Sequence, residues 1–318
     1  MVNDRRVSAP FCRSLIENGR GQKMNYPLYL VDVFAENKYA GNQLAVVRHA
    51  AALTTTEMLN ITREMNYSET TFIIADQPRN GGYDVRIFSL DEELPFAGHP
   101  TLGTAYVLQQ FIIMQQVKEV KLNLGVGQIP VSFNYLDHRP DILWMEQVTP
   151  LFGAKFETKD VAAALNLEES LIDSRFPIQE VSTGLPFIIV PLKTLDAVKA
   201  CRVDRVGYLK LVDQAEAKSV FVFCPESYQP ENQLNARMFD DYHGIAEDPA
   251  TGSANGCLAA YLVKNRYFGT SQIDLRVEQG YEIGRPSLLM LKAAENKDGQ
   301  ISVAVGGRVY LVATGELV

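Results

Sequence analysis

The fold is decided by Gly98-His99-Pro100-Thr101-Leu102-Gly103-Thr104-Ala105-Tyr106 and by its counterpart Gly252-Ser253-Ala254-Asn255-Gly256-Cys257-Leu258-Ala259-Ala260. Each stretch is a small, glycine-containing turn that leads into a helix-forming run. The two lie about 150 residues apart, and such a long internal period dictates architecture more strongly than local propensity. Two further matches keep the same order, namely residues 41–47 with 184–190, and residues 72–74 and 86–88 with 221–223 and 237–239. The sequence therefore predicts two similar half-chains, each with its own core.

Within each half, the pattern predicts several strands, one principal helix and then more strands. The predicted principal helices are residues 100–114, with their apolar side chains on one side, and 254–263. A shorter helix is expected over 54–65, and strands over 85–88, 121–133, 288–291 and 309–313. We expect an α+β fold of two pseudo-symmetric domains, each a curled mixed or antiparallel sheet around a central helix.

The expected divisions are an N-terminal extension over 1–23, a first half over 24–135 and a second half over 136–318, with the last strands free to return to the first half. Residues 1–23 contain Arg5 and Arg6 but lack the long apolar stretch and small-residue cleavage site of a secretory signal.

Composition excludes several classes of protein. The 318 residues are 47% hydrophobic and 21% charged, which is typical of a soluble globular chain. A net charge of -8, without a cluster of lysine or arginine, argues against nucleic acid as a partner. No run approaches the roughly 18 apolar residues that a membrane span requires. We therefore expect a soluble protein that binds neither nucleic acid nor membrane.

The cysteines and histidines give no sign of a metal site. Cys12, Cys201, Cys224 and Cys257 are far apart and form no CxxC pair, which favours reduced thiols in a cytoplasmic protein. The four histidines are equally dispersed, without the HxH or HxxxH spacing that places two ligands on one face. Gly125-Val126-Gly127 lacks the helix and acidic residue of a dinucleotide site, so it is interpreted as a bulge or turn. We expect neither a metal nor a cofactor.

The two helix starts are candidate anion-binding sites. The first turn of a helix has unpaired N–H groups and a partial positive charge, so a bare glycine-containing start suits a carboxylate. Two such starts could face each other across a pseudo-twofold cleft. The alternative is purely structural: Pro100 occupies the first helical turn, while His99, Thr251 or Ser253 caps the backbone.

Titratable side chains gather around these starts. Glu247 and Asp248 precede the second helix, His99 lies at the start of the first, and Glu69 stands where a helix gives way to a strand. A partly desolvated carboxylate has a raised pKa and can take and return a proton near neutral pH. An isolated glutamate at the end of a strand is more often a solvated surface residue than a catalytic one. A catalytic role for Glu69 therefore has to be supported by the surrounding motifs.

Those motifs resemble the phenazine-biosynthesis isomerase (PhzF-like) family. The resemblance runs from residues 29–34 and Gly41-Asn42 to residues 307–310, and so covers nearly everything after Met24. Its most specific pieces, in this order along the chain, are residues 68–72, 97–103, 247–254, Gln279-Gly280 and 284–287. It implies the two-domain fold shared with diaminopimelate epimerase and proline racemase, with the active site in the cleft between the halves, and it suggests a homodimer.

The resemblance also implies roles for particular residues. The family's acid/base matches Glu69, and its partners match His99, Asp248 and Ser253. Substrate binding is expected at the helix starts, through Gly98, Thr251 and Gly252, and at Asn42. The implied reaction is the cofactor-independent isomerisation of a small carboxylate-bearing metabolite, of the kind that the phenazine enzyme performs on trans-2,3-dihydro-3-hydroxyanthranilate.

The sequence leaves two other functions open, an amino-acid racemase and a binding protein without turnover. The related racemases carry a pair of cysteines at the helix-leading turns. Here neither turn contains one, and Cys257 lies beyond the second turn, inside the helix. An amino-acid racemase would need Asp248 as its second acid/base. A binding protein that keeps the cleft without turnover is the other alternative, and the intact set of Glu69, His99 and Asp248 argues against it.

Overall fold

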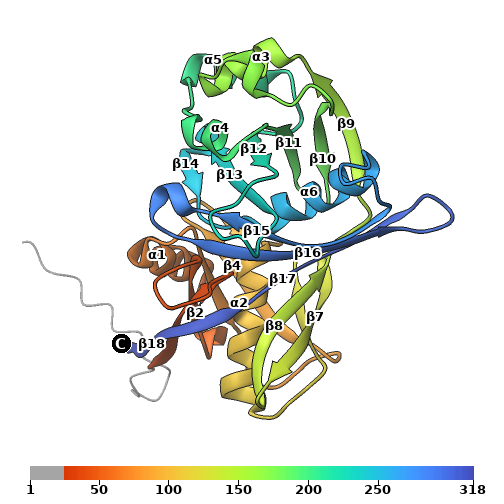
Figure 1. Ribbon diagram of the computed structural model, residues 1–318. Helices are drawn as coiled ribbons and strands as arrows, with labels where there is room; N and C mark the ends of the chain where they lie inside the picture. Colours follow the sequence, from red (N-terminus) through yellow and green to blue (C-terminus); the bar gives the residue numbers. More distant parts are fainter. Residues whose placement is uncertain (1–24) are drawn as a thin grey trace, which may run out of the picture.

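The computed structural model describes residues 25–318 (Figure 1). The first half of the chain contains β1 (Tyr26–Val33), β2 (Asn42–Val47), α1 (Thr55–Met65), β3 (Glu69–Ile73), β4 (Tyr83–Ser89), β5 (Glu93–Leu94), α2 (Gly98–Leu108), β6 (Glu119–Leu124), β7 (Gly127–Leu136) and β8 (Arg139–Glu146). The second half begins with β9 (Leu151–Phe156), α3 (Thr158–Leu165), β10 (Ile178–Ser182), β11 (Pro186–Pro191), α4 (Leu195–Ala200), α5 (Arg205–Asp213), β12 (Ser219–Cys224) and β13 (Leu234–Asp240). It ends with β14 (Ile245–Asp248), α6 (Gly252–Lys264), β15 (Gln272–Gln279), β16 (Ser287–Glu295), β17 (Ile301–Gly307) and β18 (Val309–Leu317).

The two halves pair their strands in the same way. In the first half, β1 and β2 are antiparallel, β2 and β3 parallel, β3 and β4 antiparallel, and β4 and β6 parallel. In the second half, β10 to β15 repeat this alternation through β10 and β11, β11 and β12, β12 and β13, and β13 and β15. Antiparallel ladders from β6 to β8 and from β15 to β17 complete each set. The shared order explains why the sequence matches recur in order.

Two strands, β18 and β8, link the halves. β18 lies antiparallel to β1 of the first half, whereas β9 lies antiparallel to β10 within the second half. β8 pairs with β7 on one side and with β17 on the other. The expected boundary between residues 135 and 136 falls inside β7, and the division into 24–135 and 136–318 stays a prediction. The expected extension over 1–23 lies outside the described residues.

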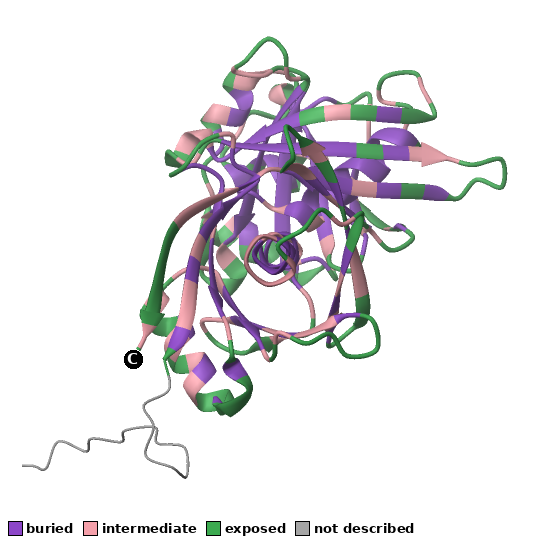
Figure 2. Cartoon of the chain, turned by 90° about the horizontal axis from the view of Figure 1, so that it is seen from below, coloured by how far each residue is buried: buried purple, intermediate pink, exposed green. Residues whose placement is uncertain are grey.

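Each principal helix is enclosed by strands, and Figure 2 shows α2 end-on within a ring of them. Almost every residue of α2 and α6 is buried, which corrects the expectation that the first helix has a single apolar side. A helix that is apolar all round belongs in a core. Helix α2 lies close against the sheet at Gly103. A Cβ atom there would lie 2.6 Å from Leu44 Cδ2 and 2.9 Å from Val33 Cγ2. The α+β fold with a central helix in each sheet is confirmed.

Local signals in the sequence account for the bounds of α1, whereas two other elements differ from expectation. Thr54 and Glu57 form a reciprocal capping box that starts α1, and Asn66 ends it in a left-handed conformation. The helix expected over 100–114 ends at Leu108 and continues as a π-helical turn over Gln109–Ile113. The strand expected over 121–133 is a hairpin, because the chain turns at Gly125 and Val126 between β6 and β7.

Within residues 25–318, no helix is long and apolar enough to cross a membrane. The same residues contain no cluster of three or more histidine, cysteine or acidic side chains that could hold a metal ion.

Candidate active site

A cavity of about 340 Å³ lies between the two halves of the chain. Seven of the eight predicted site residues line it: Glu69, Gly98, His99, Asp248, Thr251, Gly252 and Ser253. The eighth, Asn42, is buried and donates from Nδ2 to Asp248 Oδ1 at 3.0 Å. Residues far apart in the sequence are thus brought to one place, half of them from each half of the chain.

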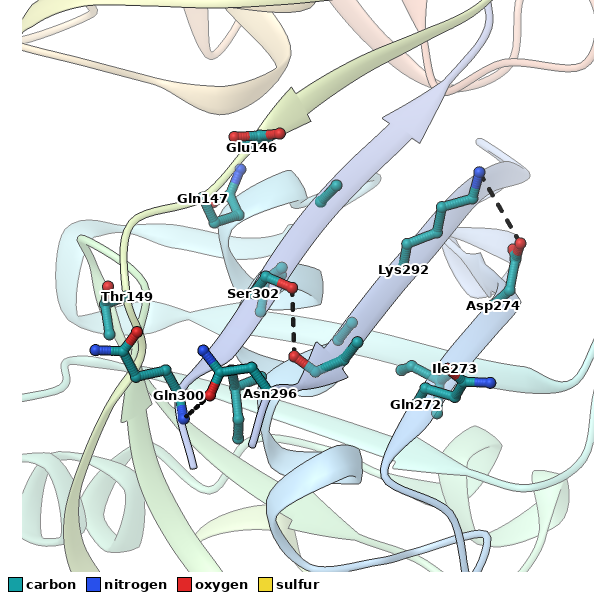
Figure 3. A pocket seen from close by; sticks show the side chains of 15 residues that line it. Glu146, Gln147, Thr149, Gln272, Ile273, Asp274, Lys292, Asn296, Gln300 and Ser302 are labelled. Atoms are coloured by element: carbon teal, nitrogen blue, oxygen red, sulfur yellow. Dashed lines mark hydrogen bonds and ion pairs between the residues drawn. The ribbon is translucent and has the colours of Figure 1, made fainter. Parts of the chain in front are cut away.

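A larger hollow of about 720 Å³ lies on the surface over β8 and β15 to β17 (Figure 3). Its lining contains none of the predicted site residues. Of the charged groups drawn there, Lys292 and Asp274 are 3.9 Å apart and both exposed. Such an exposed surface ion pair is weak evidence for a catalytic site. The cavity between the halves is therefore the better candidate for an active site.

The two principal helices begin at this cavity with bare N-termini. Neither Ala97, which precedes α2, nor Thr251, which precedes α6, caps its helix through a side chain. A Cβ atom on Gly98 would lie 3.6 Å from the backbone nitrogen of Ser253, so the two starts face each other. The capping alternative therefore does not describe these turns, and their N–H groups are available to an anion.

Glu69 is an acid of the site with a strongly raised pKa. It is the first residue of β3, and 18% of its side chain is exposed. Its Oε2 atom lies 3.4 Å from Nε2 of His99, and neither atom has a hydrogen-bond partner among the described residues. Burial, and then the negative charge of Asp248, raise the pKa of Glu69 to about 8. The carboxyl group is thus poised to exchange a proton near neutral pH.

His99 is held as a neutral imidazole. Burial lowers the pKa of His99 to about 3, although a hydrogen bond with the backbone of Gln43 acts in the opposite direction. The uncharged ring leaves Nε2 facing Glu69 without supplying a positive charge. It can therefore hydrogen-bond Glu69 or a bound ligand without stabilising the Glu69 anion as an imidazolium would.

Asp248 is fixed on both carboxylate oxygens. Oδ1 accepts from Asn42 Nδ2, and Oδ2 accepts from the Thr251 hydroxyl. Burial raises the pKa of Asp248, while the hydrogen bonds from Thr251 and Asn42 act to lower it. Asn42 comes from the first half and Asp248 from the second, so their hydrogen bond joins the halves directly beside the cavity.

Two supporting residues had no predicted role. Gln279 donates from Nε2 to the carbonyl of Asp248 at 2.9 Å and accepts from the backbone N–H of Thr251 at 3.2 Å. Asn255 donates from Nδ2 to Gln279 Oε1 at 2.9 Å and to the carbonyl of Thr251 at 3.0 Å. Both are fully buried. Gln279 belongs to the Gln279-Gly280 segment of the family resemblance, and a polar residue within an otherwise buried strand was the signal available in the sequence.

The raised pKa of Glu69 also predicts a pH-dependent cost in stability. A carboxyl whose pKa is higher in the folded chain favours folding fully below its unfolded pKa, and this contribution is lost as the pH rises through about 8. Glu69→Gln removes the titration, so its thermal stability should rise relative to the parent between pH 5 and pH 9, by roughly 4 kcal/mol. Thermal melts of both proteins across this range test it, with Glu64→Gln, an exposed glutamate of α1, as the control. A difference that stays constant with pH would contradict the titration.

Comparison with known proteins identifies the chain's family. The family model for phenazine biosynthesis-like proteins matches residues 31–315. An uncharacterized isomerase of Pasteurella multocida is 35% identical over 92% of this chain and 94% of its own length. The trans-2,3-dihydro-3-hydroxyanthranilate isomerase of Pseudomonas fluorescens is 33% identical over 91% of this chain and 98% of its own.

Solved structures agree. A Bacillus anthracis phenazine biosynthesis protein of the PhzF family aligns with a TM-score of 0.83 and 25% identity over 93% of this chain and 99% of its own. A probable proline racemase from Agrobacterium radiobacter shares the fold, with a TM-score of 0.61 and 10% identity over 92% of this chain and 93% of its own. The chain therefore belongs to the phenazine biosynthesis-like protein family and is an enzyme of the isomerase class.

Proposed function

We propose that this isomerase moves a proton between two carbons of a small carboxylate-bearing metabolite, with Glu69 as the proton carrier. The observation that carries the proposal is the free, buried Oε2 atom of Glu69 at a cavity where two uncapped helix starts meet. A carboxylate at the helix starts would be bound by backbone N–H groups, which fixes the substrate relative to Glu69.

The proposed reaction is redox-neutral. Glu69 takes a proton from a carbon next to a double bond, the electron pair of the broken C–H bond shifts the double bond, and Glu69 returns the proton at the far end of the conjugated system. Substrate and product have the same atoms, so no electron acceptor is needed. The N–H groups at Gly98 and Gly252 stabilise negative charge that spreads toward the carboxylate in the transition state. His99 and Ser253 line the same cavity within reach of the bound molecule.

The first substrate to test is trans-2,3-dihydro-3-hydroxyanthranilate, for which the relative in Pseudomonas fluorescens is named. The purified chain is incubated with this compound, and loss of the starting diene is followed by absorbance and NMR. Turnover by the parent that disappears in Glu69→Gln supports the proposal. If the parent leaves this compound unchanged, a set of related unsaturated carboxylates is screened by thermal shift, since a ligand of the folded form raises the melting temperature.

The pKa of Glu69 sets the expected pH dependence. As a base, Glu69 has to be ionised in the free enzyme, so kcat/KM should rise with pH and level off above about 8. Asp248→Asn removes the negative charge that raises the Glu69 pKa, so the rising limb should move to lower pH. It should stay above the ordinary range of a glutamate, because burial is the larger cause. Profiles of kcat/KM for the parent and Asp248→Asn test this, with Asp141→Asn, a partner of Arg308, as the control. An unmoved limb in Asp248→Asn would contradict the coupling.

The remaining expectations are also proposals. An amino-acid racemase would use Asp248 opposite Glu69, but both Asp248 oxygens already accept hydrogen bonds. A binding protein without turnover would not need a glutamate such as Glu69 with a pKa of about 8.

We further propose a homodimer and a cytoplasmic location, the latter because Cys201, Cys224 and Cys257 are free and buried thiols.

A further inference from the structure

Two motifs that carry the family resemblance have no part in the proposed reaction. Gln279-Gly280 lies at the end of β15, and residues 284–287 lead into β16. Both therefore belong to the connection between β15 and β16, in the second half of the chain. From this connection the side chain of Arg285 reaches the first half, where its partners lie next to Asn42.

The guanidinium of Arg285 makes three hydrogen bonds with the first half. Nε donates to the carbonyl of Gly41 at 2.9 Å, and Nη2 donates to the carbonyl of Ala40 at 2.7 Å and to Asp32 Oδ1 at 2.8 Å. Arginine presents these donors in one plane, so several acceptors are held at once. The carbonyl of Gly41 belongs to the peptide group that precedes Asn42. Arg285 therefore fixes the orientation of this peptide group.

The backbone at Gly41 is held just as closely. Its φ angle is +68°, and a Cβ atom there would overlap the carbonyl oxygen of Val33, so only glycine fits this turn. The N–H group of Gly41 donates to the carbonyl of Pro286 at 3.1 Å. Both backbone groups of Gly41 are thus bound by Arg285 and Pro286, and the turn before Asn42 is set from the second half of the chain.

Asn42 carries this constraint to the candidate active site. Its Nδ2 atom donates to Asp248 Oδ1 and to the carbonyl of Ala250, at 3.0 Å each. Both partners are acceptors, so the amide nitrogen has to face them. Asn42 is 2% exposed, and a buried carboxylate that loses such a donor is left with an unsatisfied oxygen. The position of Asn42 therefore decides how the Asp248 carboxylate is held.

The same connection also supports Asp248 from its backbone. Gln279 donates from Nε2 to the carbonyl of Asp248 at 2.9 Å. A Cβ atom on Gly280 would overlap the carbonyl oxygen of Arg285 and would lie 2.6 Å from that of Pro249, so the connection packs directly against the residue after Asp248. Asp248 is thus supported at its own carbonyl by Gln279.

We propose that Arg285 is a positioning residue of the active site, which acts through the Gly41–Asn42 peptide to hold the Asp248 carboxylate beside Glu69. Arg285 is not among the residues that line the cavity, so it acts on Asp248 and not on the substrate. The proposal rests on the proposed function for the part that Asp248 plays at Glu69. It gives the motif over 284–287 a role in the reaction.

NMR of the side-chain amide groups tests the positioning without a substrate. In the ¹⁵N-labelled full chain, the Asn42 signal is identified by its loss in Asn42→Ala, and its hydrogen exchange with water is measured. Arg285→Lys keeps the positive charge and loses the planar set of donors, so the exchange rate of the Asn42 amide should rise about 10-fold. Asp32→Asn removes the charged partner of the guanidinium and should raise the rate in the same direction.

The matched control is Arg308→Lys. Arg308 also joins the halves, through Asp141 at 2.6 Å and through Glu36, and its side chain is 28% exposed against 21% for Arg285. Its side-chain partners among the described residues are these two carboxylates, so it does not hold the peptide before Asn42. The exchange rate of Asn42 should equal that of the parent. An unchanged rate in Arg285→Lys, or an equal rise in Arg308→Lys, overturns the proposal.

A double-mutant cycle measures the consequence for the reaction. With a turned-over substrate, kcat/KM is compared for Arg285→Lys, Asn42→Ala and the double variant. If Arg285 acts through Asn42, the double variant should be no slower than Asn42→Ala alone, although Arg285→Lys by itself lowers kcat/KM. Losses that add in the double variant would mean that Arg285 acts independently of Asn42, which overturns the proposal. The proposed function fails by a different result, namely unimpaired turnover in Glu69→Gln.

Discussion

Replacing Glu69 with glutamine is expected to lower kcat by about 10³-fold, while the fold and the affinity for carboxylates stay close to those of the parent. Glutamine keeps the volume of the side chain and its ability to hydrogen-bond His99, but it cannot carry a proton. Oε2 of Glu69 has no hydrogen-bond partner among residues 25–318, so the substitution breaks no existing hydrogen bond. The loss should therefore appear in kcat and leave ligand affinity intact.

Steady-state kinetics with a turned-over substrate measure this effect, and calorimetry with benzoate measures the affinity. Glu64→Gln is the matched control, because the same substitution is made five residues away on the exposed face of α1. It should behave as the parent does. Activity of Glu69→Gln within a few-fold of the parent would remove Glu69 from the mechanism, since glutamine cannot carry a proton.

The architecture could be predicted because the sequence contains an internal repeat, with the same order of segments in both halves. A glycine-led turn before each principal helix has to repeat, since both helices start at the same cavity from opposite halves. The sequence pattern of α2 could not predict that strands surround this helix. A helix surrounded by strands is apolar all round, so residues such as Leu102 and Leu108 give no strong periodicity that shows which face is covered.

Site residues that belong to recognisable motifs could be predicted from the sequence. Those that only the strand topology brings to the cavity could not. Glu69, His99 and Asp248 come from three separate segments, and the resemblance supplied their association. Asp240 and His243 lie in an ordinary turn sequence, and only the β13–β14 ladder brings them to the cavity. Gln279 is similar, because its contacts to Asp248 and Thr251 depend on where β15 runs beneath the start of α6. Strand register decides these contacts, and it is not fixed by local sequence.

The repeat also bears on whether one base or two act on the substrate. In the pseudo-symmetric arrangement β3 corresponds to β12, so Glu69 at the start of β3 corresponds to Ser219 at the start of β12. Both residues line the cavity, but only one of them is an acid. Two other acids that line the cavity are buried. Asp248 has each oxygen engaged by Asn42 or Thr251, and both oxygens of Asp240 lie within 3.0 Å of His243 Nδ1. The structure thus favours a single proton carrier on one face of the substrate.

A reaction in deuterium oxide should distinguish these mechanisms. If Glu69 takes a proton from one carbon and returns it to another, the proton stays on a carboxyl group that is largely removed from water, and part of it is transferred internally. The product should then carry deuterium at a carbon different from the one that was deprotonated, with clearly less than one deuterium per molecule. NMR of the product locates the label and measures its amount.

Two-base racemisation gives the opposite pattern. The returned hydrogen would come from Asp248 after exchange with solvent, so deuterium would enter fully at the original carbon, with inverted configuration. In that case Asp248→Asn should be as damaging as Glu69→Gln. With a single carrier, Asp248→Asn keeps the proton carrier and alters mainly its pKa, so it should retain much more activity than Glu69→Gln above pH 8. Full incorporation at an inverted and otherwise unchanged centre would therefore refute the single-carrier isomerase, whereas partial incorporation at a new carbon requires one group that both removes and returns the proton.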